Sequence, residues 1–137
     1  MNKLIIYTDG GARNNPGPAG IGIVIQGEDG KEIQKYKEYI GEKTNNQTEY
    51  AALIKAMELV SGKAEKLEFF LDSELVVNQV KGLYKVKNAD IRELMFRLRT
   101  LEQDFEEINY NLIPREKNKK ADKLVNQAID EYLQFKT

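Results

Sequence analysis

Residues 3–30 have the sequence KLIIYTDGGARNNPGPAGIGIVIQGEDG, and the fold class is clearest from this stretch. An apolar and β-branched run over residues 3–9 predicts a strand that ends at Asp9. Four glycines and two prolines lie within residues 10–20, a composition that predicts a loop or a tight turn. Residues 20–26 alternate small and apolar side chains, with three isoleucines on one face, and predict a second strand.

A hairpin turn is expected directly after this second strand. The sequence Glu28-Asp29-Gly30 favours it, because an Asp-Gly pair accommodates the positive φ angles of tight hairpin turns. A third strand over residues 31–40 then returns antiparallel. Further along, apolar residues recur at helical spacing in the longer segments, and short apolar runs separate those segments. In chain order we expect a helix over residues 45–60, a strand over 67–71, a short helix capped by Ser73 and reaching about residue 81, a helix over 90–105, a strand over 107–113, a loop over 114–118 and an amphipathic helix over 119–135.

Three strands followed by alternating helices and strands predict the α/β class, with a mixed sheet flanked by helices. The chain has 137 residues, of which 41% are apolar and 31% charged, and this composition fits one globular domain with a sufficient core. We see no repeat, linker or low-complexity tract in the sequence. We therefore expect a single domain over residues 1–137.

Cysteine and histidine are both absent from the sequence. The lack of cysteine excludes thiol nucleophiles, disulfide frameworks and zinc fingers. The lack of histidine excludes the Ser-His-Asp triad and removes the most common general base near neutral pH. Any acid–base or metal chemistry must therefore use carboxylates, lysine, tyrosine or bound water.

The start of the chain carries only a short apolar run, residues 4–7, which is too short for a signal peptide or a membrane span. We therefore expect a cytoplasmic protein.

The net charge of −1 is weak evidence against nucleic-acid binding, since Lys and Arg supply most of the affinity for phosphates. Basic residues nevertheless cluster in two places, although such clusters also fit a solvated surface. The clusters are Lys81, Lys85 and Lys87, and then Arg115, Lys117, Lys119, Lys120 and Lys123.

Four acidic residues stand at strand ends or near helix starts. Asp9 and Asp72 each end a predicted strand, Glu49 lies near the start of the first helix, and Asp122 lies in the first turn of the last. In open α/β sheets ligands collect outside the carboxyl ends of the strands, so Asp9 and Asp72 are expected to face one crevice. Oxygen ligands without histidine or cysteine favour Mg²⁺ or Mn²⁺. Two such ions about 4 Å apart activate a water and stabilise the leaving oxygen in a displacement at phosphorus.

Each of these acids also has an ordinary structural explanation. Asp9 precedes two glycines and could start a turn. Glu49 and Asp122 could complement helix dipoles. Asp72 precedes Ser73, so it could belong to a helix cap. The residue types alone leave both kinds of explanation open.

Four segments around these acids resemble the signature segments of the type 1 ribonuclease H family, and they occur in the family's order. The resemblance extends from Lys3 to about Tyr132. It implies a ribonuclease H-like fold, with a five-stranded mixed sheet flanked by helices on both faces. The four segments are Tyr7-Thr8-Asp9-Gly10-Gly11-Ala12-Arg13-Asn14-Asn15-Pro16-Gly17, Thr44-Asn45-Asn46-Gln47-Thr48-Glu49, Leu71-Asp72-Ser73 and Asn118-Lys119-Lys120-Ala121-Asp122.

The resemblance implies an endonuclease that hydrolyses the RNA strand of an RNA–DNA hybrid and leaves a 5′-phosphate and a 3′-hydroxyl. Asp9, Glu49, Asp72 and Asp122 would be its catalytic residues and would bind two Mg²⁺ ions, for which Mn²⁺ can substitute. The partner would be the hybrid, with no membrane involved, and we expect a monomer.

Selection of RNA requires contacts to the 2′-hydroxyl and to the groove shape, because a magnesium pair cannot tell RNA from DNA. Short amides donate and accept at close range, and glycine lets the backbone approach closely, although Asn45 and Asn46 would also suit a helix cap. Thr44 resembles a residue that contacts a phosphate of the DNA strand. The minor-groove contacts implied by the resemblance are Gly10, Gly11, Ala12, Asn15, Asn45 and Asn46.

The sequence departs from the better-known bacterial members of the family at three places. Those members carry a histidine in the loop before the last helix, and the candidate at that place here is Arg115, which can hold a phosphate but cannot act as a base. Glu74 stands where many relatives have an amide that contacts the minor groove. A basic, Trp-containing protrusion of some relatives is replaced by the short segment 82–89, so affinity for the hybrid would be lower or would rest on Lys81, Lys85 and Lys87 instead.

Two other functions fit the same sequence. A nuclease with the same fold and metals could act on double-stranded RNA or structured DNA, which the departures at the histidine position and at Glu74 favour. A non-catalytic hybrid-binding module is the second alternative. A protein that only binds phosphates gains nothing from concentrated negative charge at the contact site, which argues against this module.

Overall fold

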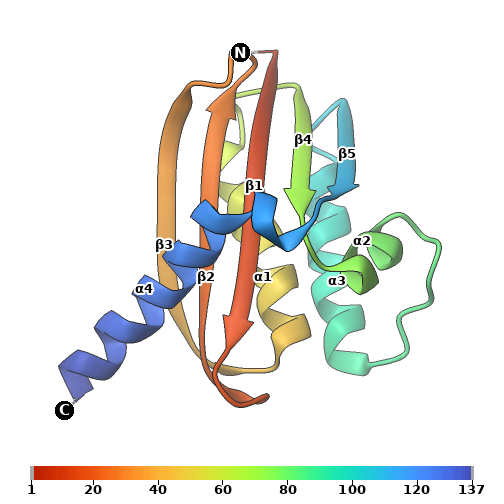
Figure 1. The fold of residues 1–137 in the computed structure, drawn as a ribbon. Helices are drawn as coiled ribbons and strands as arrows, with labels where there is room; N and C mark the ends of the chain where they lie inside the picture. Colours follow the sequence, from red (N-terminus) through yellow and green to blue (C-terminus); the bar gives the residue numbers. More distant parts are fainter. Residues whose placement is uncertain (1, 137) are drawn as a thin grey trace.

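The computed structural model describes residues 2–136 of the chain, which form one sheet with helices on both faces (Figure 1). The elements are β1 (Lys3–Ala12), β2 (Gly17–Gly27), β3 (Glu32–Lys43), α1 (Asn45–Val60), β4 (Lys66–Leu71), α2 (Glu74–Val80), α3 (Ala89–Glu102), β5 (Glu107–Leu112), a 3-10 helix η1 (Arg115–Lys117) and α4 (Lys119–Lys136). The strands lie in the order β3-β2-β1-β4-β5. β2 pairs antiparallel with both β1 and β3, whereas β4 is parallel to both β1 and β5. The expected five-stranded mixed sheet is confirmed.

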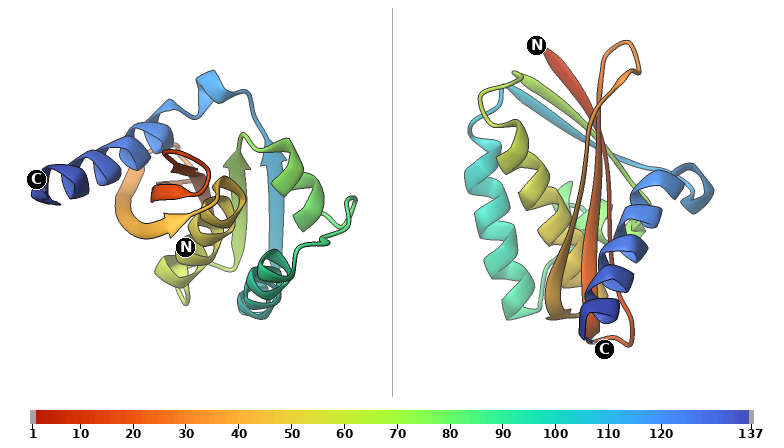
Figure 2. Two further views of the ribbon diagram at one scale, coloured as in Figure 1. Left: turned by 90° about the horizontal axis from the view of Figure 1, so that it is seen from below. Right: turned by 90° about the vertical axis from the view of Figure 1, so that its left-hand side faces the viewer.

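Helices cover the two faces of the sheet from opposite sides. α1 and α3 pack against each other on one face, and α4 crosses β2, β3 and β1 on the other (Figure 2, right). Buried apolar side chains fill both interfaces, for example Leu53 and Met57 from α1 and Val125 and Ile129 from α4. Burial of such side chains is the dominant favourable term in folding, so the sheet is stabilised from both sides. The predicted α/β class is confirmed.

Helix α1 begins and ends at the residues that the apolar periodicity predicted. Thr44 Oγ1 accepts from the Gln47 N–H (3.3 Å), and the Thr44 N–H donates to Gln47 Oε1 (2.9 Å), which makes a capping box. Gly62 follows the helix with a φ of +76°, a conformation that favours glycine. The residue that caps α1 is therefore Thr44, and the side chains of Asn45 and Asn46 do not perform this task.

The glycine-rich segment is the main correction to the predicted elements. We expected a loop over residues 10–20, but β1 continues through Ala12 and β2 begins at Gly17. The connection between the two strands is limited to residues 13–16, where Asn14 has a φ of +64° and the Asn15-Pro16 peptide bond is cis. Asp9 therefore lies within β1 and does not end it.

Two strand glycines, Gly10 in β1 and Gly22 in β2, allow helices to approach the sheet. A Cβ atom added to Gly10 would lie 2.5 Å from the carbonyl carbon of Thr48 in α1. A Cβ atom added to Gly22 would lie 2.2 Å from the carbonyl oxygen of Ala121 in α4. Real side chains essentially never approach so closely, so both helices rest directly on bare strand backbone. Gly10, which was expected in a turn, thus reflects close packing within a strand.

The remaining differences concern element ends. β3 extends to Lys43, three residues beyond the predicted end at residue 40. α3 spans Ala89–Glu102. Asn88 Oδ1 accepts from the Ile91 N–H (3.0 Å) and caps the helix one residue earlier than predicted, and the helix ends three residues before the predicted residue 105. The predicted loop over residues 114–118 contains the short helix η1. Within residues 2–136 we find no helix that combines the length and the apolar character needed to cross a membrane.

Candidate active site

Four acidic side chains from four different elements line one cleft of about 340 Å³. Asp9 comes from β1, Glu49 from α1, Asp72 from the position after β4, and Asp122 from α4. β1 and β4 are parallel neighbours, so their carboxyl ends lie at the same edge of the sheet, where open α/β sheets collect ligands. The structure therefore brings the acids expected from the sequence to one place.

Glu49 is held by the backbone of β1. The Gly10 N–H donates to Glu49 Oε1 (2.9 Å), a contact that the close approach of α1 to the glycine makes possible. The first turn of α1 contains no acidic residue, so Glu49 does not act as a partner of the helix dipole. Its second oxygen, Oε2, is buried without a hydrogen-bond partner among the described residues. Glu49 thus presents one carboxylate oxygen that the protein itself does not satisfy.

Asp72 is oriented by an asparagine that sequence analysis did not identify as a site residue. Ser73 Oγ accepts from the Val76 N–H (3.3 Å) and caps α2, so Asp72 does not serve as that cap. Asn118 Nδ2 instead donates to Asp72 Oδ2 (3.2 Å) and to the Thr8 carbonyl oxygen (2.9 Å). An asparagine just before a predicted helix looks like an ordinary cap in the sequence, so no local signal marked this contact.

Burial and mutual repulsion govern the protonation of the site. Burial raises the pKa of Asp9 to about 10, and the neighbouring carboxyl groups of Glu49 and Asp72 add to the increase. Burial also raises the pKa of Glu49, to about 7, although the Gly10 N–H and the charge of Arg115 oppose this increase. Asp9 therefore carries a proton at neutral pH when no cation offsets the negative charge around it.

The donor set suits a divalent cation. All four side chains offer carboxyl oxygens, which are the ligands that Mg²⁺ and similar hard ions prefer. A cation would satisfy the unpartnered Glu49 Oε2 and offset the repulsion that adds to the effect of burial on the pKa of Asp9. Within residues 2–136, no three acidic side chains stand in an arrangement that would hold one ion.

The raised pKa values predict that the protein without divalent cations becomes less stable as the pH rises. Asp9 and Glu49 have pKa values in the folded state that lie above their ordinary values of 3.8 and 4.5. At a pH between the ordinary and the raised pKa of each group, the folded state therefore binds more protons than the unfolded state. Their contribution to stability is complete below about pH 4 and is lost as the pH rises through about 7 for Glu49 and about 10 for Asp9. Melting temperatures measured in EDTA from pH 5 to 9 should therefore fall.

The matched control for this measurement is Asp9→Asn, which should show a much weaker fall over the same range. Addition of Mg²⁺ should also weaken the fall in the wild type, because the ion replaces protons in offsetting the charge. A wild-type melting temperature that is independent of pH in EDTA, or identical slopes for wild type and variant, would contradict the assignment.

Five of the nine expected substrate contacts lie in the cleft. Gly10, Gly11, Asn45, Asn46 and Arg115 line the cleft together with the four acids. Ala12, Asn15, Thr44 and Glu74 are outside its lining. Ser73, expected from the sequence only as a helix cap, also lines the cleft.

Asn45 connects α1 to the end of β1 and to the loop that follows. The Ala12 N–H donates to Asn45 Oδ1 (2.9 Å), and the Asn45 N–H donates to Asn15 Oδ1 (2.9 Å). Neither amide Nδ2 group donates to another described residue, so both are available as donors. Glu74 differs from these residues, since it is the exposed first residue of α2 and is not connected to them.

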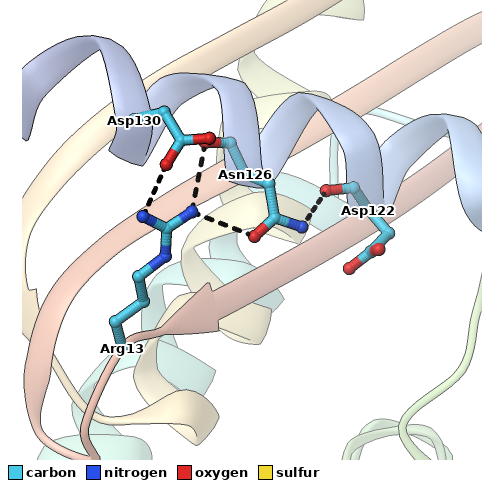
Figure 3. A network of polar contacts seen from close by, with 4 residues as sticks. All are labelled: Arg13, Asp122, Asn126 and Asp130. Atoms are coloured by element: carbon cyan, nitrogen blue, oxygen red, sulfur yellow. Dashed lines mark hydrogen bonds and ion pairs between the residues drawn. The ribbon is translucent and has the colours of Figure 1, made fainter.

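Arg13 ties the loop over residues 13–16 to helix α4. Its guanidinium donates to Asp130 Oδ1 (2.6 Å) and to Asn126 Oδ1 (3.2 Å), as Figure 3 shows. Asn126 Nδ2 in turn donates to the Asp122 carbonyl oxygen (3.1 Å), which leaves the Asp122 carboxylate outside the network (Figure 3). Exposed ion pairs of this kind contribute about 1 kcal/mol or less, so the network aligns the two elements more than it stabilises them.

Known protein structures share this fold over nearly the whole chain. The family described as reverse transcriptase-like matches residues 7–128. LC11-RNase H1, isolated from compost, has been crystallised in complex with an RNA/DNA hybrid. It is 46% identical with a TM-score of 0.91, over 95% of this chain and 99% of that chain. RNase H1 from the halophilic archaeon Halobacterium salinarum is 37% identical with a TM-score of 0.92, over 95% and 99% of the two chains.

Sequence relatives lead to the same family. The bifunctional protein Rv2228c of Mycobacterium tuberculosis is 41% identical over 130 residues, which cover 93% of this chain. The match covers 36% of that protein, so the chain spans about a third of the length of this relative. Ribonuclease HI of Halobacterium salinarum is 38% identical over 130 residues, covering 94% of this chain and 65% of that protein. From the family match and the near-complete overlap with two RNase H1 structures, the chain belongs to the type 1 ribonuclease H family within the reverse transcriptase-like group.

Proposed function

We propose that this protein is an endonuclease that hydrolyses the RNA strand of RNA–DNA hybrids and leaves a 5′-phosphate and a 3′-hydroxyl. The observation that carries the proposal is the convergence of four carboxyl groups from four elements on one cleft, next to free amide donors. The family relationship supports it, because LC11-RNase H1 forms a complex with an RNA/DNA hybrid. The apolar core and the single sheet support a single catalytic domain over residues 1–137. The monomeric state and the cytoplasmic location expected from the sequence stay predictions.

Asp9, Glu49, Asp72 and Asp122 are the proposed catalytic residues, and they would hold two Mg²⁺ ions, with Mn²⁺ as a substitute. Enzymes of the ribonuclease H family depend on metal ions, and the all-oxygen donor set favours these two. When bound, the ions would supply an activated water and stabilise the leaving 3′-oxygen. The net reaction adds this water across the phosphodiester: its oxygen bonds to phosphorus, the P–O3′ bond breaks, and the 3′-oxygen takes a proton.

The residues of this chain prepare the site for that reaction. The Gly10 N–H holds the carboxylate of Glu49 in one orientation, and Asn118 Nδ2 holds the carboxylate of Asp72. Arg115 lines the cleft and is close enough to Glu49 to lower its pKa. We assign to Arg115 the task of holding the scissile or released phosphate, since a guanidinium matches phosphate geometry but cannot accept a proton at neutral pH.

We assign the selection of the RNA strand to residues at the end of β1, in the loop over residues 13–16 and at the start of α1. The backbone of Gly10, Gly11 and Ala12 and the amides of Asn15, Asn45 and Asn46 would contact ribose hydroxyls and base edges in the minor groove. Thr44 would contact the DNA strand near a phosphate. Glu74 is exposed and acidic, so we assign to it at most a peripheral contact in the minor groove.

A comparison of three substrates tests the proposed function. Labelled RNA–DNA hybrid, double-stranded RNA and duplex DNA are incubated side by side with Mg²⁺, with Mn²⁺ or with EDTA. We expect cleavage of the hybrid alone, in its RNA strand, with either ion and not in EDTA, and products that carry 5′-phosphates. Equal cleavage of double-stranded RNA or duplex DNA would reassign the substrate, and binding of hybrid without cleavage in either ion would indicate a binding module.

A further inference from the structure

Asn118 stands at a helix start, but its side chain does not cap the helix. The Asp122 N–H donates to the Asn118 carbonyl oxygen (3.1 Å), which makes Asn118 the residue that precedes the first turn of α4. An asparagine at this position normally accepts from the backbone of its own helix through Oδ1. Here Oδ1 is buried without a partner among the described residues, and the residue is 1% exposed. The amide is instead turned toward the sheet.

The buried amide group of Asn118 lowers the stability of the folded protein relative to an apolar side chain at this position. A buried polar atom without a hydrogen-bond partner costs about 1–3 kcal/mol, and an apolar side chain would avoid this cost. What the amide contributes is its Nδ2 group, which donates to the Thr8 carbonyl oxygen at 2.9 Å and to Asp72 Oδ2 at 3.2 Å. The first acceptor is the residue before Asp9, and the second belongs to a proposed catalytic carboxylate.

Asn118 thereby connects three of the four acids. Its side chain contacts the backbone of β1 next to Asp9 and the carboxylate of Asp72, while its carbonyl oxygen accepts from the backbone of Asp122. Because Oδ2 of Asp72 is engaged, the orientation of this half-buried carboxylate is determined and its other oxygen is left for the cleft. A carboxylate without such a donor would rotate, and the start of the helix that carries Asp122 would lose its hydrogen bond to the β1 backbone next to Asp9.

We propose that Asn118 is a positioning residue that orients the Asp72 carboxylate and sets the placement of Asp122 relative to Asp9. This inference rests on the proposed function, in which these carboxylates bind the divalent ions. Partners that orient metal ligands through hydrogen bonds typically affect metal affinity or activity by about 10–100-fold. Asn118 acts through the acids and does not itself contact the substrate.

The test compares Asn118→Ala with a matched amide outside the cleft. Asn111 Nδ2 also donates to a carboxylate, Glu68 Oε1 (2.9 Å), and to a backbone carbonyl, that of Phe69 (2.9 Å). We expect Asn118→Ala to lower kcat on hybrid by about 10–100-fold with KM changed less than about twofold, and to weaken Mn²⁺ binding measured by calorimetry about tenfold. Asn111→Ala should leave kcat and Mn²⁺ affinity near the wild-type values, whatever its effect on the melting temperature.

Several outcomes would overturn the proposal. The proposal is wrong if Asn118→Ala keeps the wild-type kcat and Mn²⁺ affinity, or if Asn111→Ala loses as much of both. It is also wrong if the wild-type protein does not bind Mn²⁺. If circular dichroism shows that Asn118→Ala does not fold, Asn118→Ser replaces it with the same expectation, since the shorter side chain cannot reach both acceptors. A wild type that cuts no hybrid would refute the proposed function, but the difference in Mn²⁺ affinity would still decide the role of Asn118.

Discussion

Asp9→Asn is expected to abolish the cleavage of RNA–DNA hybrid in Mg²⁺ and in Mn²⁺, and at the same time to stabilise the protein in EDTA. Loss of a carboxylate that holds catalytic ions costs several kcal/mol of transition-state stabilisation, and about 4 kcal/mol corresponds to roughly a 10³-fold lower rate. Stability should rise because wild-type Asp9 must take up a proton on folding at neutral pH, its pKa being about 10, whereas asparagine is already neutral. One pKa unit corresponds to about 1.4 kcal/mol, so we expect a gain of roughly a few kcal/mol.

Opposite changes in activity and stability separate a catalytic role from a structural one. The measurements are initial cleavage rates on labelled hybrid and urea unfolding in EDTA at neutral pH. Asp104→Asn is the control, since Asp104 is exposed, lies outside the cleft and undergoes the same change of charge. It should alter neither quantity. An Asp9→Asn protein that cuts hybrid at the wild-type rate would show that the metal assignment is wrong.

Gly10→Ala is expected to destabilise the protein by about 2–3 kcal/mol, in the upper part of the range for overpacking, and to lower the rate of hybrid cleavage at least tenfold. The added Cβ atom would lie 2.5 Å from both the carbonyl carbon and the carbonyl oxygen of Thr48. These are backbone atoms of α1 and cannot turn aside as a flexible side chain can. β1 and α1 must therefore separate, which lengthens the hydrogen bond from the Gly10 N–H to Glu49 Oε1 and releases that carboxylate.

The neighbouring glycine provides the control for stability. A Cβ atom on Gly11 would meet Val125 Cγ1 at 3.4 Å, which is ordinary contact, so Gly11→Ala should change the free energy of unfolding by less than about 1 kcal/mol. Unfolding in urea, compared between the two variants, tests this difference. Equal stability of Gly10→Ala and the wild type would mean that α1 does not rest on β1 as closely as the structure shows.

The sequence was sufficient to predict those helices and turns that are specified by their own residues and immediate neighbours. Helix α1 spans the predicted residues 45–60, because its apolar periodicity is continuous and Gly62 follows it. The hairpin after β2 was equally local: Gly30 adopts a φ of +82°, and its N–H donates to the Gly27 carbonyl oxygen (3.0 Å). The four acids were identifiable for another reason, since their flanking residues resemble four family segments. Residue type alone left each of them with an ordinary alternative.

Other features depend on partners that are distant in the sequence. A glycine at position 10 fits a turn and fits equally well a strand on which a helix packs closely. Only the position of α1 in the folded chain decides between the two. Asn118 resembles a helix cap in the sequence, yet its side chain donates to Thr8, 110 positions earlier. The protonation of Asp9 likewise depends on its burial and on Glu49 and Asp72, which approach it only in the folded chain.

The sequence by itself therefore determined the class of the fold, most of its helices and strands, and the identity of the four acids. The tertiary structure alone decided how those acids meet, which amide orients one of them, and why the glycines occur within strands. The physical reason is range: backbone propensities and side-chain periodicity act between near neighbours along the chain. Burial, charge repulsion and steric contact act between groups that only folding brings together.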